Sequence, residues 1–236
     1  MVSQSKIAVM QPYIFPYIGY FQLIKTTDVF VFYNDVNFIV RGWINRNRIL
    51  NNNNAYFFTI GCKKISQNKR ICDTELYFKR KQKIKLLNTI YHNYSRAPFF
   101  EPVYNIFKET INSSVSYIDE LAISSVKNIC QFLSIKTVFK SSKNLYGNDD
   151  LKGPERLIDI CLKEKKLEYI NLIGAKNIYK KEYFIQRGIK LKFLKSNLCS
   201  YSQFKSPFVP MLSIIDVLMF NGSEKTNMLL SKYELI

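Results

Sequence analysis

The chain has 236 residues, of which 47% are hydrophobic, so it can bury a sizeable core and is not a disordered chain. It carries 35 lysines and arginines against 18 aspartates and glutamates, which gives a formal net charge of +17. This charge attracts any anionic partner: nucleotides, nucleic acid, acidic carrier proteins or anionic membrane surfaces. An AT-rich genome also favours Lys, Asn, Ile, Tyr and Phe, so charge alone does not select a partner.

The cysteines and the hydropathy exclude further classes of protein. Five cysteines are scattered along the chain without close pairs, at positions 62, 72, 130, 161 and 199. This spacing argues against a disulfide framework or a zinc site and favours a reducing compartment. Residues 1–6 lack the apolar stretch of a signal peptide, and no run approaches the length of a membrane span. We therefore expect a soluble, cytoplasmic protein with no metal and no cofactor.

Residues 7–33 predict a strand, a stiff loop, a helix and a second strand. A short apolar run at 7–10 leads into a loop that contains Pro12 and Pro16. After Gly19 the apolar spacing becomes helical, and a second apolar run follows at 29–33. Such a unit places its loop and helix start at the carboxyl ends of parallel strands, where open α/β sheets bind ligands. We expect a binding site there.

Polar side chains and the only tryptophan follow the second strand within a short reach. They are Asn34, Asp35, Asn37, Arg41, Trp43, Asn45, Arg46, Asn47 and Arg48. Arginine suits phosphate or carboxylate, asparagine suits sugar hydroxyls and base edges, and tryptophan offers a face to a ring. The alternative is a polar turn between strands. We favour a ligand site, because tryptophan and arginine are costly choices for a plain turn.

The rest of the chain alternates between strand and helix patterns. We predict strands at 55–60, 71–78, 136–140, 168–172 and 188–193, and helices at 79–94, 103–110, 115–133, 153–163, 183–187 and 214–220. The strand at 55–60 follows 29–33 too closely for a parallel crossover, so we expect it to pair antiparallel at the sheet edge. These elements predict one α/β domain over residues 1–236, Rossmann-like, with a mostly parallel sheet and flanking helices. A helical, lysine-rich insertion interrupts it at roughly residues 61–135.

Four further features are candidates for a functional role. His92, the sole histidine, is a candidate base but has no neighbour that would make a metal site. Gly174 follows a strand, where a backbone amide can approach a phosphate. Asp216 lies in an apolar helix, either as an anchor for the preceding loop, which we favour, or as a site carboxylate. The lysines of 79–94 form a solvated face or a docking surface for an anionic partner.

Across these residues the chain resembles the WbqC-like family, named for a product of O-antigen gene clusters. The matching segments are 11–24, 28–49, 156–161, 169–174, 183–184, 188–189 and 208–222. The resemblance implies a role in bacterial surface-polysaccharide biosynthesis, through modification of a nucleotide-linked amino sugar. It spans nearly the whole chain.

Residues 16–24 also resemble the His-x-Gly-His loop of nucleotidylyl transferases and pantothenate synthetase. Tyr17 and Tyr20 stand at the two histidine positions. Cationic contact with phosphate is therefore lost, and only hydroxyl donors remain. This departure argues against the use of ATP, while a Rossmann-like layout remains consistent with it.

The leading hypothesis is an enzyme that transfers an acyl or aminoacyl group from an activated donor, such as an acidic carrier protein, to the amine of a nucleotide-linked amino sugar. Asp35, His92 and Gln11 are the candidate catalytic residues, as base or for orientation, and Arg46 and Arg48 the candidate phosphate ligands. The other predicted ligand-binding residues are Tyr17, Gly19, Tyr20, Gln22, Asn37, Arg41, Trp43, Asn45, Asn47 and Gly174. The alternatives are an ATP-using adenylate-forming or nucleotidylyl-transferring enzyme and, ranked last because the basic residues are dispersed, a non-catalytic nucleic-acid-binding protein.

Overall fold

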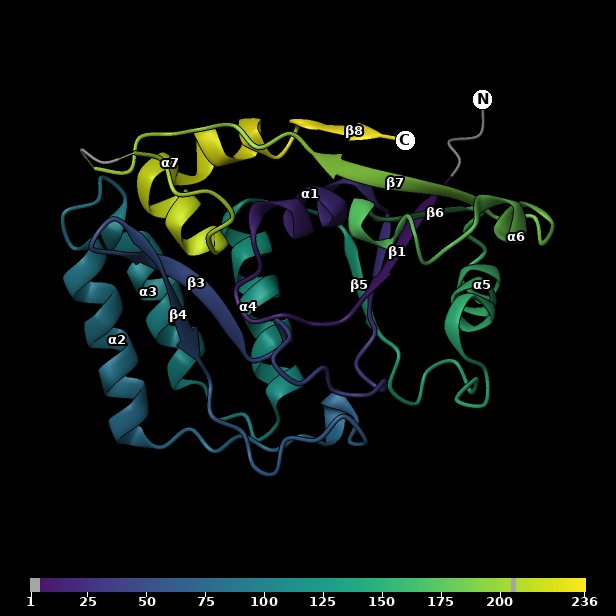
Figure 1. Cartoon of the computed structure of the whole chain (residues 1–236), viewed down its shortest axis with the longest axis horizontal. Helices are drawn as coiled ribbons and strands as arrows, with labels where there is room; N and C mark the ends of the chain where they lie inside the picture. The colour runs from purple at the N-terminus through teal and green to yellow at the C-terminus, as the bar shows by residue number, and fades with distance from the viewer. Residues whose placement is uncertain (1–4, 205–206) are drawn as a thin grey trace.

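A six-stranded sheet forms the centre of the computed structural model, which describes residues 5–204 and 207–236 (Figure 1). The strands are β1 (Lys6–Met10), β2 (Val29–Phe32), β5 (Val138–Ser141), β6 (Glu168–Leu172), β7 (Lys190–Ser196) and β8 (Tyr233–Leu235), in the order β5-β2-β1-β6-β7-β8. All neighbours pair in parallel except β7 and β8. The predicted Rossmann-like, mostly parallel α/β sheet is confirmed. Residues 1–4, which belong to the start predicted to lack a signal peptide, lie outside the described residues.

Helices cover both faces of this sheet, which explains why its central strands are continuous apolar runs. One face packs on α5 (Gly153–Lys163) and α6 (Lys181–Ile185), where Val9 and Val31 contact residues such as Leu157. The other face packs on α1 (Ile18–Thr26), α4 (Ile118–Phe132) and α7 (Ile214–Leu229). Alternate residues of each strand therefore enter different cores.

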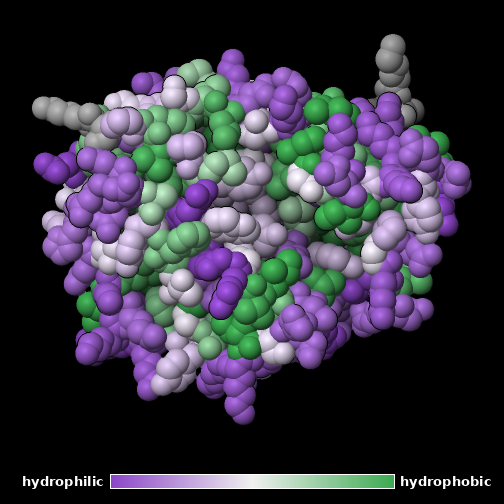
Figure 2. All heavy atoms as spheres, in the orientation of Figure 1, coloured by the Kyte–Doolittle hydropathy of each residue, from purple (hydrophilic) through white to green (hydrophobic). Residues whose placement is uncertain are grey.

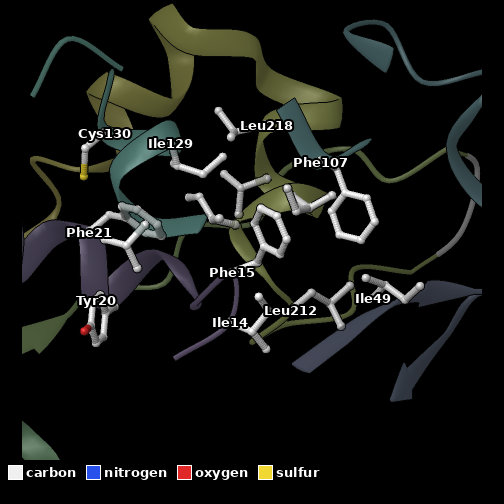
Figure 3. Close-up of a cluster of buried hydrophobic side chains, with 14 of the residues drawn as sticks. Ile14, Phe15, Tyr20, Phe21, Ile49, Phe107, Ile129, Cys130, Leu212 and Leu218 are labelled. Atoms are coloured by element: carbon white, nitrogen blue, oxygen red, sulfur yellow. The ribbon is translucent and has the colours of Figure 1, made fainter. Parts of the chain in front are cut away.

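The helical middle of the chain extends the second of these cores. Helices α2 (Arg80–Tyr94) and α3 (Phe100–Asn112) pack beside α4, and one hydrophobic cluster runs from Phe30 in the sheet to Ile90 in α2. Phe15, in the loop after β1, stacks on Phe107 of α3 with ring centroids 4.7 Å apart (Figure 3). The loop that leaves β1 is thus fixed by the helical segment.

Two predicted strands differ from the structure. Strand β4 (Asn54–Thr59) pairs with β3 (Arg46–Asn51) in a separate antiparallel hairpin, so the predicted pairing with the main sheet is wrong. Strand β5 already occupies that edge, beside β2. Residues 71–78 form a short 3-10 helix, η1 (Ile71–Asp73), followed by isolated bridges at Glu75 and Leu76, in place of a strand.

The sequence pattern also missed some structure near the C-terminus. Helix α7 continues past Gly222, where the backbone kinks at a φ of 61° and the ring of Phe99 lies close by. Strand β8 was not predicted, and residues 173–175 form a 3-10 helix, η2 (Ile173–Ala175). Within residues 5–204 and 207–236, no helix is long and apolar enough to cross a membrane.

Candidate functional site

The connections that leave β1 and β6 diverge across the sheet. The chain passes from β1 through α1 to β2 on one side, and from β6 through α6 to β7 on the other side. Because β1 and β6 are neighbours, a crevice opens between their carboxyl ends. Open α/β sheets bind ligands at such a switch point. The fold therefore defines a candidate ligand site before any side chain is considered.

A pocket of about 350 Å³ lies at this switch point. The walls of the pocket come from four segments: the loop after β1, the start of the β3–β4 hairpin, the segment after β6 and the segment before α7. They supply Met10, Tyr13, Pro16, Tyr17, Trp43, Asn47, Arg48, Asn171, Leu172, Gly174, Ala175, Ile178 and Met211. Figure 2 shows hydrophobic side chains exposed on the face of the molecule, with hydrophilic ones around them. Apolar walls with a few polar groups are typical of sites for small organic molecules.

Arg48 is the positively charged side chain of this lining. Its Nη2 donates to the backbone oxygen of Met211 at 2.8 Å, and its guanidinium carbon lies 5.4 Å from the centroid of the Trp43 ring. Its Nε is buried and has no hydrogen-bond partner among the described residues. The guanidinium is thus positioned by one bond and retains donors for an anion.

Trp43 and Arg48 belong to a stack of four side chains on the outer face of the hairpin. The Trp43 ring stacks on Phe57 at 5.9 Å, and Arg46 lies 5.0 Å from the centroid of the Phe57 ring. Arg46 also donates from Nε to the oxygen of Gly42 at 2.9 Å and from Nη2 to the oxygen of Arg41. Arg46 therefore holds the turn before β3, whereas Arg48 faces the pocket.

Two tyrosines, Tyr13 and Tyr17, line the pocket. Burial raises the pKa of Tyr13, and burial together with the nearby Tyr13 raises the pKa of Tyr17 to about 12. Both are therefore neutral phenols at physiological pH and can donate hydrogen bonds. A Cβ atom on Gly19 would lie 2.4 Å from the ring of Tyr17. Gly19 lies outside the lining and leaves room for the Tyr17 ring, and its predicted role in ligand binding stays a prediction.

Asn47 and Asn45 use their amide groups to hold the loops around the pocket. Asn47 lines the pocket, yet its Nδ2 donates to the oxygens of Ile14 and Phe15 at 3.0 and 2.6 Å. Asn45 is buried and donates to the oxygen of Ile60 at 2.8 Å. Asn47 therefore shapes the site by fixing the loop after β1, and Asn45 fastens the ends of the hairpin.

Three further predicted residues lie behind the pocket wall. Tyr20 is fully buried and donates its hydroxyl to the backbone oxygen of Gln11 at 2.8 Å. The side chain of Gln22 is buried and donates to the oxygens of Leu229 and Lys232 at 3.0 and 2.9 Å. These contacts fix α1 against the loop after β1 and the end of α7. Gln11 itself is half-buried and outside the lining.

Both candidate bases lie outside the lining. Asp35 is buried, accepts from Nη2 of Arg156 at 2.6 Å, and accepts from the hydroxyl of Ser142. His92 is exposed on α2, where its ring lies 6.0 Å from that of Tyr91. Asp35 is therefore one half of a buried ion pair, and His92 is a surface residue of the helical segment.

The structure thus brings together five of the predicted site residues: Tyr17, Trp43, Asn47, Arg48 and Gly174. Asn37 and Arg41 are exposed on the segment between β2 and β3, away from this lining. The lining residues that the prediction missed include Met10, Tyr13, Asn171, Ile178 and Met211. The first three lie at or just after the ends of β1 and β6, a signal that sequence can supply, whereas Met211 reaches the pocket only through the tertiary fold.

No group of three or more metal-ligating side chains gathers within the described ranges, 5–204 and 207–236.

Asp216 anchors the segment that precedes α7, which is the role that we favour for it from the sequence. Its Oδ1 accepts from Tyr201 and Gln203 of the preceding segment at 2.6 Å each, and its Oδ2 accepts from Tyr94 at 2.8 Å. This buried carboxylate fastens the 201–203 segment to α7.

The fold and the pocket define an α/β protein with a candidate ligand site at the switch point of its sheet. Comparison with models of protein families matches residues 11–228 to the WbqC-like protein family, and the chain belongs to this family. It is also similar to the uncharacterized protein Rv1507c of Mycobacterium tuberculosis, with 27% identity over 226 residues that cover 93% of this chain and 95% of that protein. No solved structure matches. The family relates the chain to polysaccharide biosynthesis.

Proposed function

We propose that the switch-point pocket binds a nucleotide-linked amino sugar and that the protein transfers an acyl or aminoacyl group to the amine of that sugar, in surface-polysaccharide biosynthesis. The observation that carries this proposal is the side chain of Arg48, which places a positive charge beside the exposed Trp43 ring at the switch point. A cation next to an aromatic surface suits a ligand that combines phosphate with rings.

The shape of the pocket supports a ligand of this kind. A volume of about 350 Å³ falls within the range of small-molecule sites. Arg48 and the N-terminal end of α1, beside Pro16 and Tyr17, favour the negative charge of a diphosphate. Trp43, Met211 and the half of the lining after β6 offer apolar walls to the rings. In this arrangement the phosphates lie between the two ring-binding walls.

The chemistry that we propose needs little acid–base help from the protein. The sugar amine attacks the carbonyl carbon of the activated acyl group, the bond from that carbon to the carrier breaks, and the proton lost by nitrogen passes to the departing carrier atom. The carbonyl oxygen gains negative charge on the way. Tyr13 and Tyr17 are neutral donors in the lining and are suited to stabilise it. No histidine or carboxylate lines this pocket among the described residues, so the leaving group takes the proton.

A panel of ligands tests the proposal. Nucleotide-linked 3-amino and 4-amino sugars should raise the melting temperature, because a ligand that binds only the native state stabilises it. The matched nucleotide-linked sugars with a hydroxyl in place of the amine serve as controls for binding without reaction. With an acyl thioester present, mass spectrometry should detect the acyl mass on the amino sugar and not on its hydroxyl counterpart. A large shift with ATP and magnesium, and none with the amino sugars, would replace this proposal with an ATP-using enzyme.

A further inference from the structure

One edge of the β3–β4 hairpin has no neighbouring strand. In the register of this hairpin, Ile60 donates its N–H to the oxygen of Asn45 at 2.7 Å, so every second residue of β4 bonds to β3. The intervening residues Ala55, Phe57 and Thr59 direct their N–H and C=O groups away from β3. No described residue forms a hydrogen bond with these groups. Strand β4 therefore presents a free edge to solvent.

The chain itself pairs with this edge a few residues further on. Tyr77 donates its N–H to the oxygen of Gly61, and Lys63 donates to the oxygen of Glu75, both at 2.8 Å. This pairing is antiparallel, and it ends at residue 78, where the chain turns into α2. An extended segment thus pairs with this edge at residues 61–63, whereas no segment of the chain pairs with it at residues 55–59.

A groove of about 330 Å³ occupies the open place, between β4 and α2. Phe57 and Thr59 line it from the strand, Lys85 and Leu86 from the helix, and Phe78 from the turn between them. Phe57 is 45% exposed although it is a large aromatic residue. The groove therefore combines apolar walls with unpaired backbone groups.

The charges of α2 add a third feature. Four cations lie in the N-terminal half of this helix, Arg80, Lys81, Lys83 and Lys85, and Lys79 is its N-cap residue. Residues 79–94 contain no acidic side chain. The N-terminal end of a helix is already the positive end of its dipole, so cations there are unfavourable. None of the five forms an ion pair with a described carboxylate. An anionic partner would relieve this repulsion.

We propose that β4 and α2 bind an acidic, extended segment of a partner protein, which adds as a third strand beside residues 55–59 and continues the line of residues 75–77. The strand edge selects a polypeptide, because only a peptide backbone supplies donors and acceptors at the matching spacing. Lys85, which lines the groove, selects acidic side chains. A flat membrane surface would not enter the groove between β4 and α2.

The docking surface formed by β4 and α2 is connected to the pocket through one aromatic stack. Phe57 lines the groove and stacks on Trp43, which lines the pocket at the switch point. A partner bound to β4 therefore lies beside the mouth of the pocket. If the proposed function holds, the carrier of the acyl group is the partner that this geometry fits, but the docking itself does not depend on that function.

A fluorescent peptide of alternating valine and glutamate is the probe. Fluorescence anisotropy should detect its binding, and hydrogen exchange should slow at the amides of Phe57 and Thr59 in the complex. The control peptide has the same sequence but carries N-methyl groups on alternate backbone amides, which prevents strand pairing. Its affinity should fall at least about tenfold, because the methylated backbone cannot donate the hydrogen bonds that strand addition requires. Equal binding of both peptides, or unchanged exchange at these amides, would overturn the proposed strand addition.

Protein variants test the contribution of charge. Lys81→Glu combined with Lys85→Glu should weaken binding of the acidic peptide, whereas Lys108→Glu combined with Lys127→Glu changes the net charge equally on exposed positions of α3 and α4. Equal losses in the two double variants would show a non-specific charge effect and contradict the site. Vesicles with phosphatidylglycerol provide the membrane comparison. Strong vesicle binding that depends on Lys81 and Lys85, together with no peptide binding, would replace the protein partner with a membrane surface.

Discussion

Arg156 of α5 donates from Nη2 to Oδ2 of Asp35 at 2.6 Å, and the two side chains are only 6% and 2% exposed. The same guanidinium donates to Oδ1 of Asn148 at 3.0 Å and to Oδ1 of Asp149 at 2.8 Å. This network ties the start of α5 to the segment that follows β2. The arginine that neutralises Asp35 is thus distant in sequence and is none of the three arginines between residues 41 and 48.

Arg156→Ala should cost about 3–5 kcal/mol of the free energy of unfolding, because it leaves the Asp35 carboxylate buried without its cation. Urea unfolding measures the change. Arg46→Ala is the control, since the side chain of Arg46 is half-buried and bonds only to backbone oxygens of its own turn. We expect that variant to lose about 1 kcal/mol or less. Similar losses in the two variants would contradict the structural role assigned to the Asp35–Arg156 pair.

Arg48→Ala should lower the affinity for a nucleoside diphosphate about 10- to 100-fold. A hydrogen bond to a charged group contributes roughly 1.5–3 kcal/mol, and Arg48 is the arginine of the pocket lining. Arg48→Lys should fall between the alanine variant and the wild type, because lysine keeps the charge but loses the planar donor geometry. Calorimetric titration measures the three affinities, with Arg46→Ala expected to bind like the wild type. If Arg46→Ala lost more affinity than Arg48→Ala, the assignment of the two arginines would be reversed.

Gly19→Ala should weaken ligand binding with little change in stability. The added Cβ would lie 2.4 Å from Cε2 of Tyr17, at the far end of a side chain that can rotate away. Alanine also favours helix over glycine by about 1 kcal/mol, which offsets the strain. Because Gly19 acts through Tyr17, adding Gly19→Ala to Tyr17→Ala should change the affinity no further. Additive losses in the double variant would indicate that Gly19 contacts the ligand directly.

The stability of the protein should depend on the ionisation of Asp216. Burial raises the pKa of this carboxyl above its ordinary value of 3.8, although Tyr201, Gln203 and Tyr94 donate to it. The folded state then holds the proton more tightly than the unfolded state, so this contribution is full below pH 3.8 and is lost as pH rises through the raised pKa. The free energy of unfolding of the wild type should therefore fall relative to that of Asp216→Asn as the pH rises above about 4. Urea unfolding across this range checks the sign, and a shift in favour of the wild type would contradict it.

The opening unit of the fold was predictable because its signals are local. The apolar run at 7–10, the prolines at 12 and 16 and the helical spacing after Gly19 each act over a few residues. The same holds for most of the later helices and parallel strands. Strand β3 was missed because Arg46, Asn47 and Arg48 resemble a polar turn. The strand is held by segments distant in sequence, for example by the N–H of Ser213, which donates to the oxygen of Arg48.

The candidate site was predictable only in part, for a related reason. Position after β1 and β2 identified Tyr17, Trp43, Asn47 and Arg48 as site residues, and position after β6 identified Gly174. Sequence could not rank Arg46 against Arg48, since the two lie two residues apart on the same face of β3 and differ in the partners that they contact. It also could not show that Asp35 forms an ion pair with Arg156, or that the amide nitrogen of Gln22 donates hydrogen bonds to the oxygens of Leu229 and Lys232.

The sequence by itself determined the class of the protein: an α/β chain with a parallel sheet, a polar stretch after its second strand and an excess of positive charge. These properties follow from local periodicity and composition, which short-range sterics and burial translate directly into elements. Only the tertiary structure decided which polar groups remain free for a ligand. That outcome depends on pairs such as Asp35 with Arg156 or Arg48 with Met211, and each pair is selected by packing between elements more than one hundred residues apart.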